Sequence, residues 1–349
     1  MYTEYYGLSR MPFQLTPDST FFFDSAEHTR AMAFLNYGIS QGEGFVVVTG
    51  EVGAGKTTLV DRLLSTLDAT RYVAGRIVTT QLNSYDMLRM VGASFQILRE
   101  GMDKATLLHR IAQLIGELHA QNKRAVLVVD EAQSLTREAL EELRMLSNLD
   151  VTGAPPLQSV LLGQPEFRAV LASPDLEQLR QRVTASCHLG ALNAADTRRY
   201  IEHRLTRADW KGTPSFSSEA FQQIYRFTAG IPRRINTLCS RLLLLGFLEE
   251  RRHIDEAVVV SVATELEVEL GPLTNVAAEE RATAASPAGG ANGSDGESVR
   301  AVRQLRDDVV PRIARIEQKM DQHEQALNRA LDLAIKHLPI PSSRSEPLS

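Results

Sequence analysis

Residues Gly50 to Thr57 carry the spacing G-x-x-x-x-G-K-T, which is typical of loops that bind nucleotide phosphates. Its glycines let the backbone wrap tightly, so that several N–H groups point at one anion. Lys56 brings a charge to the β- and γ-phosphates, and Thr57 brings a hydroxyl group to Mg²⁺. A glycine-rich turn is the alternative, but the apolar run before the loop and the helical spacing after it favour phosphate binding. The residues predicted to bind the nucleotide are Gly50, Glu51, Val52, Gly53, Ala54, Gly55, Lys56, Thr57 and Thr58.

Two carboxylates follow a second apolar run, Ala125 to Val129. Asp130 is predicted to hold Mg²⁺ together with Thr57, mainly through the water shell of the metal. Glu131 comes next and is aimed differently, so we expect it to polarise the attacking water as the general base. A solvated acidic turn after a strand is the alternative. The phosphate loop upstream favours a site for ATP hydrolysis with Mg²⁺.

Three further side chains are candidates for sensing or assisting hydrolysis. Gln164 ends the apolar run that begins at Leu157, where its amide could contact the γ-phosphate or the attacking water; an ordinary turn before Pro165 is the alternative. Arg180 or Arg182 could reach the nucleotide of a neighbouring subunit as an arginine finger, or could lie on the surface. The sequence does not choose between these two arginines.

Another arginine opens a helix further along the chain. Arg233 follows Pro232, a residue that suits the first turn of a helix. If this helix belongs to a lid that folds over the nucleotide, Arg233 can contact the γ-phosphate and couple hydrolysis to lid movement. Alternatively, Arg233 and Arg234 form a basic helix start that faces solvent.

The candidate residues need a scaffold of buried strands. Apolar runs of strand length alternate with helical spacing in the first half of the chain, which predicts an α/β fold with a parallel sheet flanked by helices. Later residues show amphipathic helices, with Ser217 and Asp255 as predicted helix starts. The expected strands are 45–49, 76–82, 125–129 and 157–162, and the expected helices include 84–98 and 104–121.

The chain is expected to divide into five segments. Residues 1–190 form the nucleotide-binding core with its N-terminal aromatic segment, and residues 191–272 form a small all-α lid. Residues 273–298, rich in Ala, Gly and Ser, form a flexible linker. Residues 299–338 repeat apolar side chains at three- and four-residue steps, which predicts a coiled-coil or docking helix or, equally, a solvent-exposed one. Residues 339–349 form a disordered tail.

Composition narrows the classes of function. The 349 residues include 38 basic and 43 acidic side chains, for a net charge of −5, so the chain carries no global basic field for nucleic acid or an acidic membrane. No run reaches the roughly 18 apolar residues that a membrane span requires, and no signal peptide is visible. The two cysteines, Cys187 and Cys239, suggest no disulfide framework. We therefore expect a cytoplasmic protein without an integral membrane span.

Taken together, the motifs resemble those of an AAA+ ATPase, and more closely those of the general secretion pathway protein A (ExeA-type) group. The irregular aromatic residues of 1–24 open a stretch that resembles the N-terminal signature of that group. The resemblance covers roughly residues 1–270. The segments that carry it are GEVGAGKTT, VLVVDEAQ, LLGQPEF, LRQRV, GIPRRIN and YYGLSRMPFQLTPDSTFFFDSAEHTRAMAFL.

This resemblance implies a doubly wound core, a helical lid and a hexamer-like ring of identical subunits with nucleotide between them. It places the N-terminal aromatic segment near the adenine. Gln81 and Asn83 would restrain Glu131 between cycles. The remaining roles would fall to Gln164 as sensor 1, Arg233 as sensor 2, and Arg180 or Arg182 as the arginine finger.

ExeA-type secretion proteins follow this core with a membrane span and a periplasmic peptidoglycan-binding region, whereas this sequence shows a linker and one helical segment. A soluble subgroup associated with exosortase/PEP-CTERM and exopolysaccharide loci resembles the chain more closely. The leading hypothesis is a cytoplasmic ATP-driven motor or assembly factor for envelope secretion, exosortase sorting or exopolysaccharide export. Its C-terminal helix would dock on an envelope partner, which could recruit it to the inner membrane. The alternatives are a DNA-binding regulatory ATPase of the transposition type, which the net acidity disfavours, and a nucleotide-gated switch with negligible turnover.

Overall fold

The computed structural model describes residues 2–16, 18–78, 82–149, 153 and 156–270. Gln81 and the linker, helix and tail expected within 273–349 lie outside the described residues. In the part of the chain that is described, no helix is long and apolar enough to cross a membrane.

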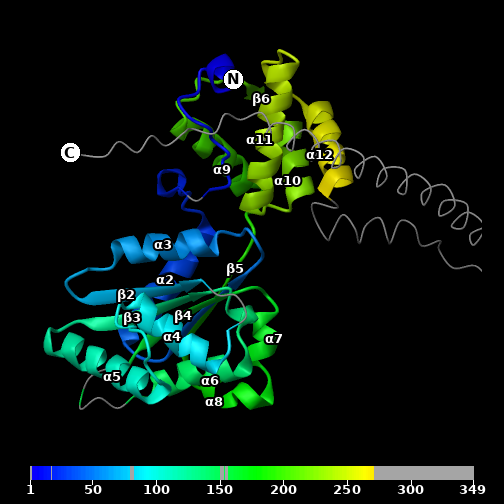
Figure 1. Ribbon diagram of the computed structural model, residues 1–349. Coiled ribbons are helices and arrows are strands. Elements are labelled where there is room, and N and C mark those ends of the chain that lie inside the picture. Colours follow the sequence, from blue (N-terminus) through cyan, green and yellow to red (C-terminus); the bar gives the residue numbers. More distant parts are fainter. Residues whose placement is uncertain (1, 17, 79–81, 150–152, 154–155, 271–349) are drawn as a thin grey trace, which may run out of the picture. The chain divides into compact units, whose positions relative to one another are not determined.

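Five parallel strands form a sheet in the order β2-β3-β4-β1-β5 (Figure 1). The strands are β1 (Phe45–Gly50), β2 (Tyr72–Val78), β3 (Arg124–Asp130), β4 (Gln158–Gly163) and β5 (Val183–Leu189). Phe45 of β1 pairs with Ser159 on one side and with Val183 on the other. Because all the strands are parallel, their carboxyl ends lie at one edge, where the phosphate loop follows β1. The predicted α/β fold with a parallel sheet is confirmed.

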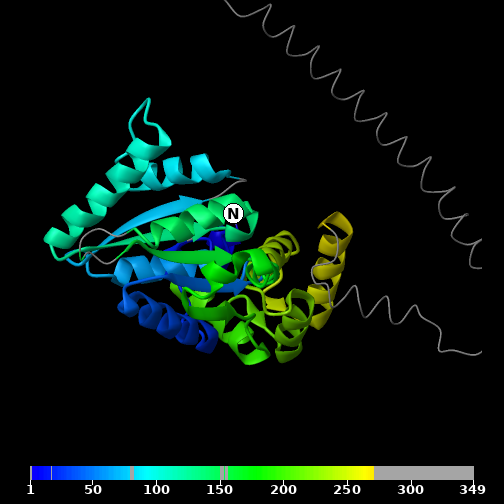
Figure 2. The same cartoon turned by 90° about the horizontal axis from the view of Figure 1, so that it is seen from below.

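Alternate side chains of the strands pack on opposite faces of the sheet, as the period of a strand requires. Val47 and Leu127 contribute to the cluster under α4 to α7, whereas Val46 and Val126 contribute to the cluster under α2 and α3 (Figures 1 and 2). The helices of this part are α2 (Ala26–Gln41), α3 (Lys56–Thr66), α4 (Ser84–Ser94), α5 (Lys104–Ala120), α6 (Arg137–Leu146), α7 (Phe167–Leu171) and α8 (Glu177–Arg180), with short 3₁₀ turns at Ser19–Phe21, Ala132–Ser134 and Pro174–Leu176.

Two predicted boundaries were wrong for local reasons. Strand β2 begins at Tyr72 rather than Arg76, because an edge strand with half-exposed residues lacks the continuous apolar run of a central strand. Helix α4 ends at Ser94 rather than Leu98. Gln96 has a φ of 60°, and the amides of the next two residues donate to the carbonyl of Gly92, which closes the helix.

Four helices after β5 enclose a second core (Figure 1). As predicted, Ser217 Oγ accepts from the amide of Ala220 at 3.0 Å, and Asp255 accepts from Val258 at 3.0 Å. The elements are α9 (Ala194–Arg207), α10 (Ser218–Thr228), α11 (Pro232–Leu248) and α12 (Glu256–Leu270), with a two-stranded pair β6 (Ser215–Phe216) and β7 (His253–Ile254). We call this helical part the lid.

The N-terminal segment packs into the core of the lid. It was expected to be irregular, but it begins with helix α1 (Tyr2–Tyr6). Tyr6 is buried there, and its hydroxyl donates to the carbonyl of Arg251 at 3.0 Å. Phe13 is also buried in this core. Aromatic side chains that looked irregular in sequence therefore join residues 2–13 to the lid.

Candidate nucleotide site

The loop after β1 forms a cradle of backbone N–H groups at the start of α3. Gly53 and Gly55 have φ values of 83° and 102°, in the region that favours glycine. Gly55 occupies the N-cap position of α3 without a side-chain hydrogen bond, which leaves the N-terminal amides directed outward for an anion. A Cβ atom on Gly53 would lie only 2.3 Å from the Cβ of Arg233, so glycine is also required by the approach of the lid.

Lys56 is held at this cradle. Its Nζ donates to the carbonyl oxygens of Gly50 at 2.7 Å and Glu51 at 3.0 Å. Burial lowers the pKa of the Lys56 ammonium, and the negative charges of Glu131 and Asp130 oppose this shift. The carbonyl contacts fix the charged end of the side chain beside the loop, where phosphates would lie.

A hydroxyl and a carboxylate meet at the ends of α3 and β3. Thr57 Oγ1 donates to Asp130 Oδ2 at 2.9 Å, and Asp130 is only 4% exposed. Oxygen ligands of these two kinds are the ones that Mg²⁺ prefers, so the residues fit the predicted metal site. Arg76 of β2 lies 3.5 Å from the same carboxylate oxygen and also pairs with Asp61 at 2.6 Å. Arg76 was missed, because nothing in a strand sequence marks which neighbour its side chain meets.

Glu131 lies at a sharp turn after β3, with a φ of 55°. Its Oε2 accepts hydrogen bonds from Gln133 Nε2 at 2.5 Å and from Gln164 Nε2 at 3.2 Å. Gln133 Oε1 in turn accepts from the backbone amide of Gln164 at 2.9 Å. Gln133 was not predicted as a functional residue. Its position in the acidic motif, two residues after Glu131, was the available signal.

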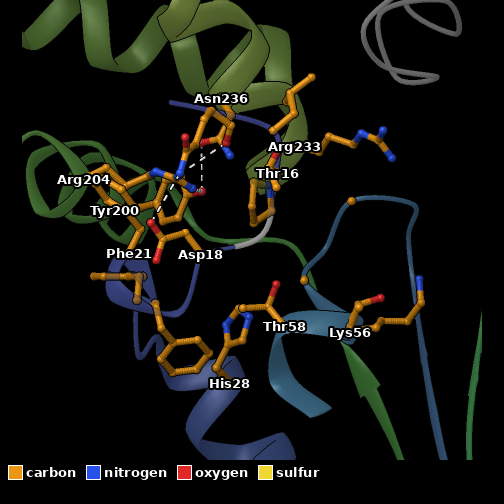
Figure 3. Close-up of a pocket in the computed structure, with 18 of the residues that line it drawn as sticks. Thr16, Asp18, Phe21, His28, Lys56, Thr58, Tyr200, Arg204, Arg233 and Asn236 are labelled. Atoms are coloured by element: carbon orange, nitrogen blue, oxygen red, sulfur yellow. Dashed lines mark hydrogen bonds between the residues drawn. The ribbon is translucent and has the colours of Figure 1, made fainter. Parts of the chain in front are cut away.

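A cavity of about 340 Å³ opens above the phosphate loop (Figure 3). Its walls come from the N-terminal segment, including Phe21 and Phe22, from α2 through His28, and from the lid. The predicted site residues that line it are Val52, Gly53, Gly55, Lys56, Thr57, Thr58, Glu131 and Arg233. Asp130 and Gln164 do not line the cavity, but each is hydrogen-bonded to a residue that does, Thr57 and Glu131 respectively. The remaining predicted residues also lie outside the lining: Gly50 ends β1, and Glu51 and Ala54 belong to the loop.

Helix α11 begins at Pro232, as predicted, and touches the loop directly. The amide of Arg233 donates to the carbonyl of Gly53 at 3.2 Å. The exposed Arg233 side chain extends from the lid on the side of Lys56 (Figure 3). The lid and the phosphate loop are therefore joined at one backbone contact, beside the predicted sensor.

Three other predicted residues, Arg180, Arg182 and Asn83, lie outside the lining of the cavity. The carbonyl of Arg182 accepts from the amide of Phe45 at 2.9 Å, which places Arg182 at the amino end of β1. Arg180 ends α8 nearby and is exposed. Both are thus at the opposite end of the strands from the cavity. Asn83 caps α4, where its Oδ1 accepts from the amide of Asp86 at 2.9 Å.

Sequence comparisons place the same residues in a known family. A family model described as AAA domain matches residues 39–171. General secretion pathway protein A of Aeromonas hydrophila is 41% identical over 249 residues, which make up 71% of this chain and 45% of that protein. The chain therefore spans less than half the length of this relative.

Solved structures share the fold at low sequence identity. The ORC2 protein of Aeropyrum pernix, in its ADPNP-ADP complexes, is similar with a TM-score of 0.58 and 15% identity, over 74% of this chain and 72% of that chain. Cdc6p of Pyrobaculum aerophilum gives a TM-score of 0.55 and 17% identity, over 70% and 67% of the two chains. On the family match, the relative and the parallel-sheet core together, the chain belongs to the AAA+ ATPases and is of the general secretion pathway protein A (ExeA) type.

Proposed function

We propose that this chain binds ATP with Mg²⁺ in the cavity above the phosphate loop and hydrolyses it. The observation that carries the proposal is that Lys56, Thr57 and Glu131 line one cavity while Asp130 is hydrogen-bonded to Thr57. The cavity volume of about 340 Å³ is in the range of small-molecule sites. Phosphate charge, metal ligands and a base would thus meet at one place.

Each residue has a role that follows from its position. The amides of the loop and of the α3 N-terminus bind the phosphates, and Lys56 adds its charge. Thr57 and Asp130 would hold Mg²⁺, which neutralises charge on the phosphate oxygens when bound. Glu131 orients the attacking water and accepts its proton, and Gln164 beside it responds to the γ-phosphate.

The lid would convert this chemistry into movement. Arg233 contacts the loop through its backbone, so an arginine–phosphate contact from the same residue would pull α11 toward the nucleotide. Arg180 and Arg182 lie away from the cavity of their own chain, which supports a role in a neighbouring subunit. We therefore propose a hexamer-like ring of identical subunits, with nucleotide at the contacts between subunits.

The cellular role is proposed from the ExeA-type relationship. A motor or assembly factor for envelope secretion, exosortase sorting or exopolysaccharide export would work in the cytoplasm and be recruited to the inner membrane by a partner. The segment 299–338 is the proposed docking helix. Deleting residues 276–349 should preserve ATP hydrolysis and abolish recruitment to membranes of the source cell. Recruitment that survives this deletion would rule out the docking role.

Steady-state phosphate release and ATP binding test the enzymatic proposal on the full chain. Lys56→Ala should weaken ATP binding, because it removes the charge beside the phosphates. Glu131→Gln should bind ATP with wild-type affinity and stop hydrolysis. Equal turnover by wild type and Glu131→Gln would remove Glu131 from the mechanism. Tight ATP binding by a wild-type protein without turnover would instead favour a nucleotide-gated switch.

A further inference from the structure

Three side chains on the lid side of the cavity form a continuous hydrogen-bonded chain (Figure 3). Arg204 Nη1 donates to the hydroxyl of Tyr200 at 2.8 Å, and this hydroxyl donates to Asn236 Oδ1 at 2.9 Å. Arg204 and Tyr200 lie one turn apart on α9, and Asn236 lies on α11. All three line the same cavity as Lys56 and Thr57.

Arg204, at one end of this network, fixes which group donates and which accepts in both hydrogen bonds. A guanidinium group has donors only, so the oxygen of Tyr200 must accept from Arg204. The single proton of Tyr200 is then directed to Asn236 Oδ1. Burial raises the pKa of Tyr200, which keeps this proton in place. The amide of Asn236 is thereby oriented with its Nδ2 group, a pair of N–H donors, away from Tyr200.

Arg204 is itself held firmly. It is only 7% exposed, and its Nε donates to the carbonyl of Pro12 at 2.5 Å. Its Nη2 donates to the carbonyl of Gln14 at 3.4 Å, and its guanidinium lies 4.8 Å from the ring centroid of Phe21. The same arginine that orients Tyr200 therefore also attaches the N-terminal segment to the lid.

The donor at the other end, Asn236 Nδ2, is available to an acceptor in the cavity. Asn236 is only 7% exposed, and among the described residues its Nδ2 forms no hydrogen bond. The Nδ2 atom itself is open to the cavity, because it is not one of the fully buried side-chain atoms without a partner in the described part of the chain. An acceptor on a ligand that meets this donor contributes to binding. Asn236 faces the cavity, so a bound molecule can supply that acceptor.

The position of Asn236 on α11 indicates which part of a nucleotide it meets. Arg233 touches Gly53 of the phosphate loop. Asn236 lies three residues further along the helix, a rise of about 4.5 Å. The phosphates are taken by the loop amides, so the group beside Asn236 is the nucleoside.

We propose that Asn236 donates a hydrogen bond to an acceptor on the nucleoside, either a purine ring nitrogen or a ribose oxygen, and that Tyr200 and Arg204 are positioning residues for it. The inference rests on the proposed binding of ATP. It puts phosphate and nucleoside recognition on one helix, because α11 would contact the phosphates through Arg233 and the nucleoside through Asn236.

Calorimetric titration of the full chain with MgATP and with magnesium triphosphate, which lacks the nucleoside, tests this role. For Asn236→Ala, the Kd for ATP should rise about tenfold while the Kd for triphosphate stays unchanged. Tyr200→Phe keeps the ring and should cause a smaller rise for ATP, with no further rise when combined with Asn236→Ala. Arg241 lies on α11, the same helix as Asn236, and forms an exposed ion pair with Glu269 of α12; Arg241→Ala should change neither Kd.

The outcomes separate the inference from the proposed function. Unchanged ATP affinity in Asn236→Ala, or an equal loss for ATP and triphosphate, would overturn the contact with the nucleoside while leaving ATP binding intact. A wild-type chain that binds neither ligand would overturn the proposed function and this inference with it. If Asn236→Ala fails to fold, Tyr200→Phe provides the test: a higher Kd for ATP with an unchanged Kd for triphosphate supports the contact, and any other result overturns it. Titrations with 7-deaza-ATP and 2′-deoxy-ATP then test N7 of the base and O2′ of the ribose as the acceptor. The analogue that lacks the acceptor binds with an affinity that no longer depends on Asn236→Ala, whereas sensitivity retained by both analogues places the acceptor at another atom of the nucleoside.

Discussion

Gln164 donates its side-chain amide to Oε2 of Glu131 over 3.2 Å. The proposed sensor therefore contacts the proposed base directly. Gln133 joins the two residues a second time. Its Nε2 donates to the same carboxylate oxygen at 2.5 Å, and its Oε1 accepts from the backbone amide of Gln164 at 2.9 Å. An N–H group of Gln164 that holds Glu131 is not available to a γ-phosphate. The second N–H of the same amide group can meet a γ-phosphate while the first holds Glu131, which would connect sensing to the position of the base.

Replacing Gln133 should slow hydrolysis without weakening ATP binding. Gln133→Ala removes both links to Glu131 and Gln164, and a misplaced base costs about ten- to a hundredfold in rate. The expected result is a fall in kcat at unchanged KM, measured by steady-state phosphate release. Gln113→Ala on the exposed face of α5, where the side chain contacts Glu117, is the control. A rise in KM at unchanged kcat would contradict the positioning role.

Adding a methyl group to Gly53 should separate the lid from the phosphate loop. Gly53→Ala strains a position with a φ of 83° and places a Cβ atom 2.3 Å from that of Arg233. The left-handed conformation alone costs roughly 1–2 kcal/mol. We expect a lower melting temperature together with weaker ATP binding in calorimetry.

The matched control for Gly53 is Gly212, which has a φ of 90° but no atom within 4 Å of an added Cβ. Gly212→Ala should lower the melting temperature and leave ATP affinity unchanged. If both variants bind ATP as the wild type does, the contact between α11 and the loop has no role in binding.

Strand burial explains which parts of the fold the sequence predicted. β1, β3 and β4 are covered on both faces, so their sequences are continuous apolar runs that can be recognised. β2 and β5 form the edges of the sheet and carry polar residues such as Arg76, Thr184 and His188. Their boundaries, or their existence, therefore escaped prediction. Local signals such as the helix starts at Ser217 and Asp255 were sufficient because a cap is formed within four residues.

The site, like the fold, has parts that the sequence predicted and parts that it did not. The phosphate loop and the pair Asp130–Glu131 are contiguous in sequence, so their chemistry can be inferred from spacing. The contact between Gln164 and Glu131 joins residues 33 positions apart, and the contact between Arg204 and Pro12 joins residues 192 positions apart. Pairings of this kind depend on tertiary packing, and no periodicity or motif in one sequence encodes them.

The stability of the chain should fall as the pH drops below neutral, in part through His28. Burial lowers the pKa of His28, against the opposing charges of Asp24 and Glu27, and its Nδ1 lies 2.7 Å from Ser25 Oγ. In the unfolded chain the same imidazole titrates at about 6.5. As the pH falls through this value, the unfolded state binds the proton first, so folding loses stability until the pH is below the pKa of the folded state.

Urea unfolding at pH 7.5 and pH 5.5 measures this effect. The free energy of unfolding of the wild type should be lower at pH 5.5, and the difference should shrink in His28→Gln. It should not vanish, because burial also lowers the pKa of His188 and His203. An identical pH difference in wild type and His28→Gln would show that His28 is protonated equally in both states.

Arg180 is the better candidate for a finger that acts in trans. Its side chain is exposed, with one long contact of 3.4 Å to the carbonyl of Ala172. Arg182 is half-buried, its Nη1 donates to the carbonyl of Ser147, and its own carbonyl is bound by Phe45. We expect Arg180→Ala to lower kcat by a hundredfold or more, on the order seen when an arginine finger is lost. Arg182→Ala should have a smaller effect on kcat, with a lower melting temperature.

Mixing two inactive proteins tests whether Arg180 acts on a neighbour. Arg180→Ala keeps its own phosphate loop, and Lys56→Ala keeps its arginine. In a mixed ring, an Arg180→Ala subunit that binds ATP can receive Arg180 from an adjacent Lys56→Ala subunit, so phosphate release should recover in part. The double variant carrying both changes in one chain is the control, because mixing it with Arg180→Ala supplies no arginine. Mixtures that stay as inactive as their components, at concentrations where the chains associate, would show that Arg180 does not serve the neighbouring site.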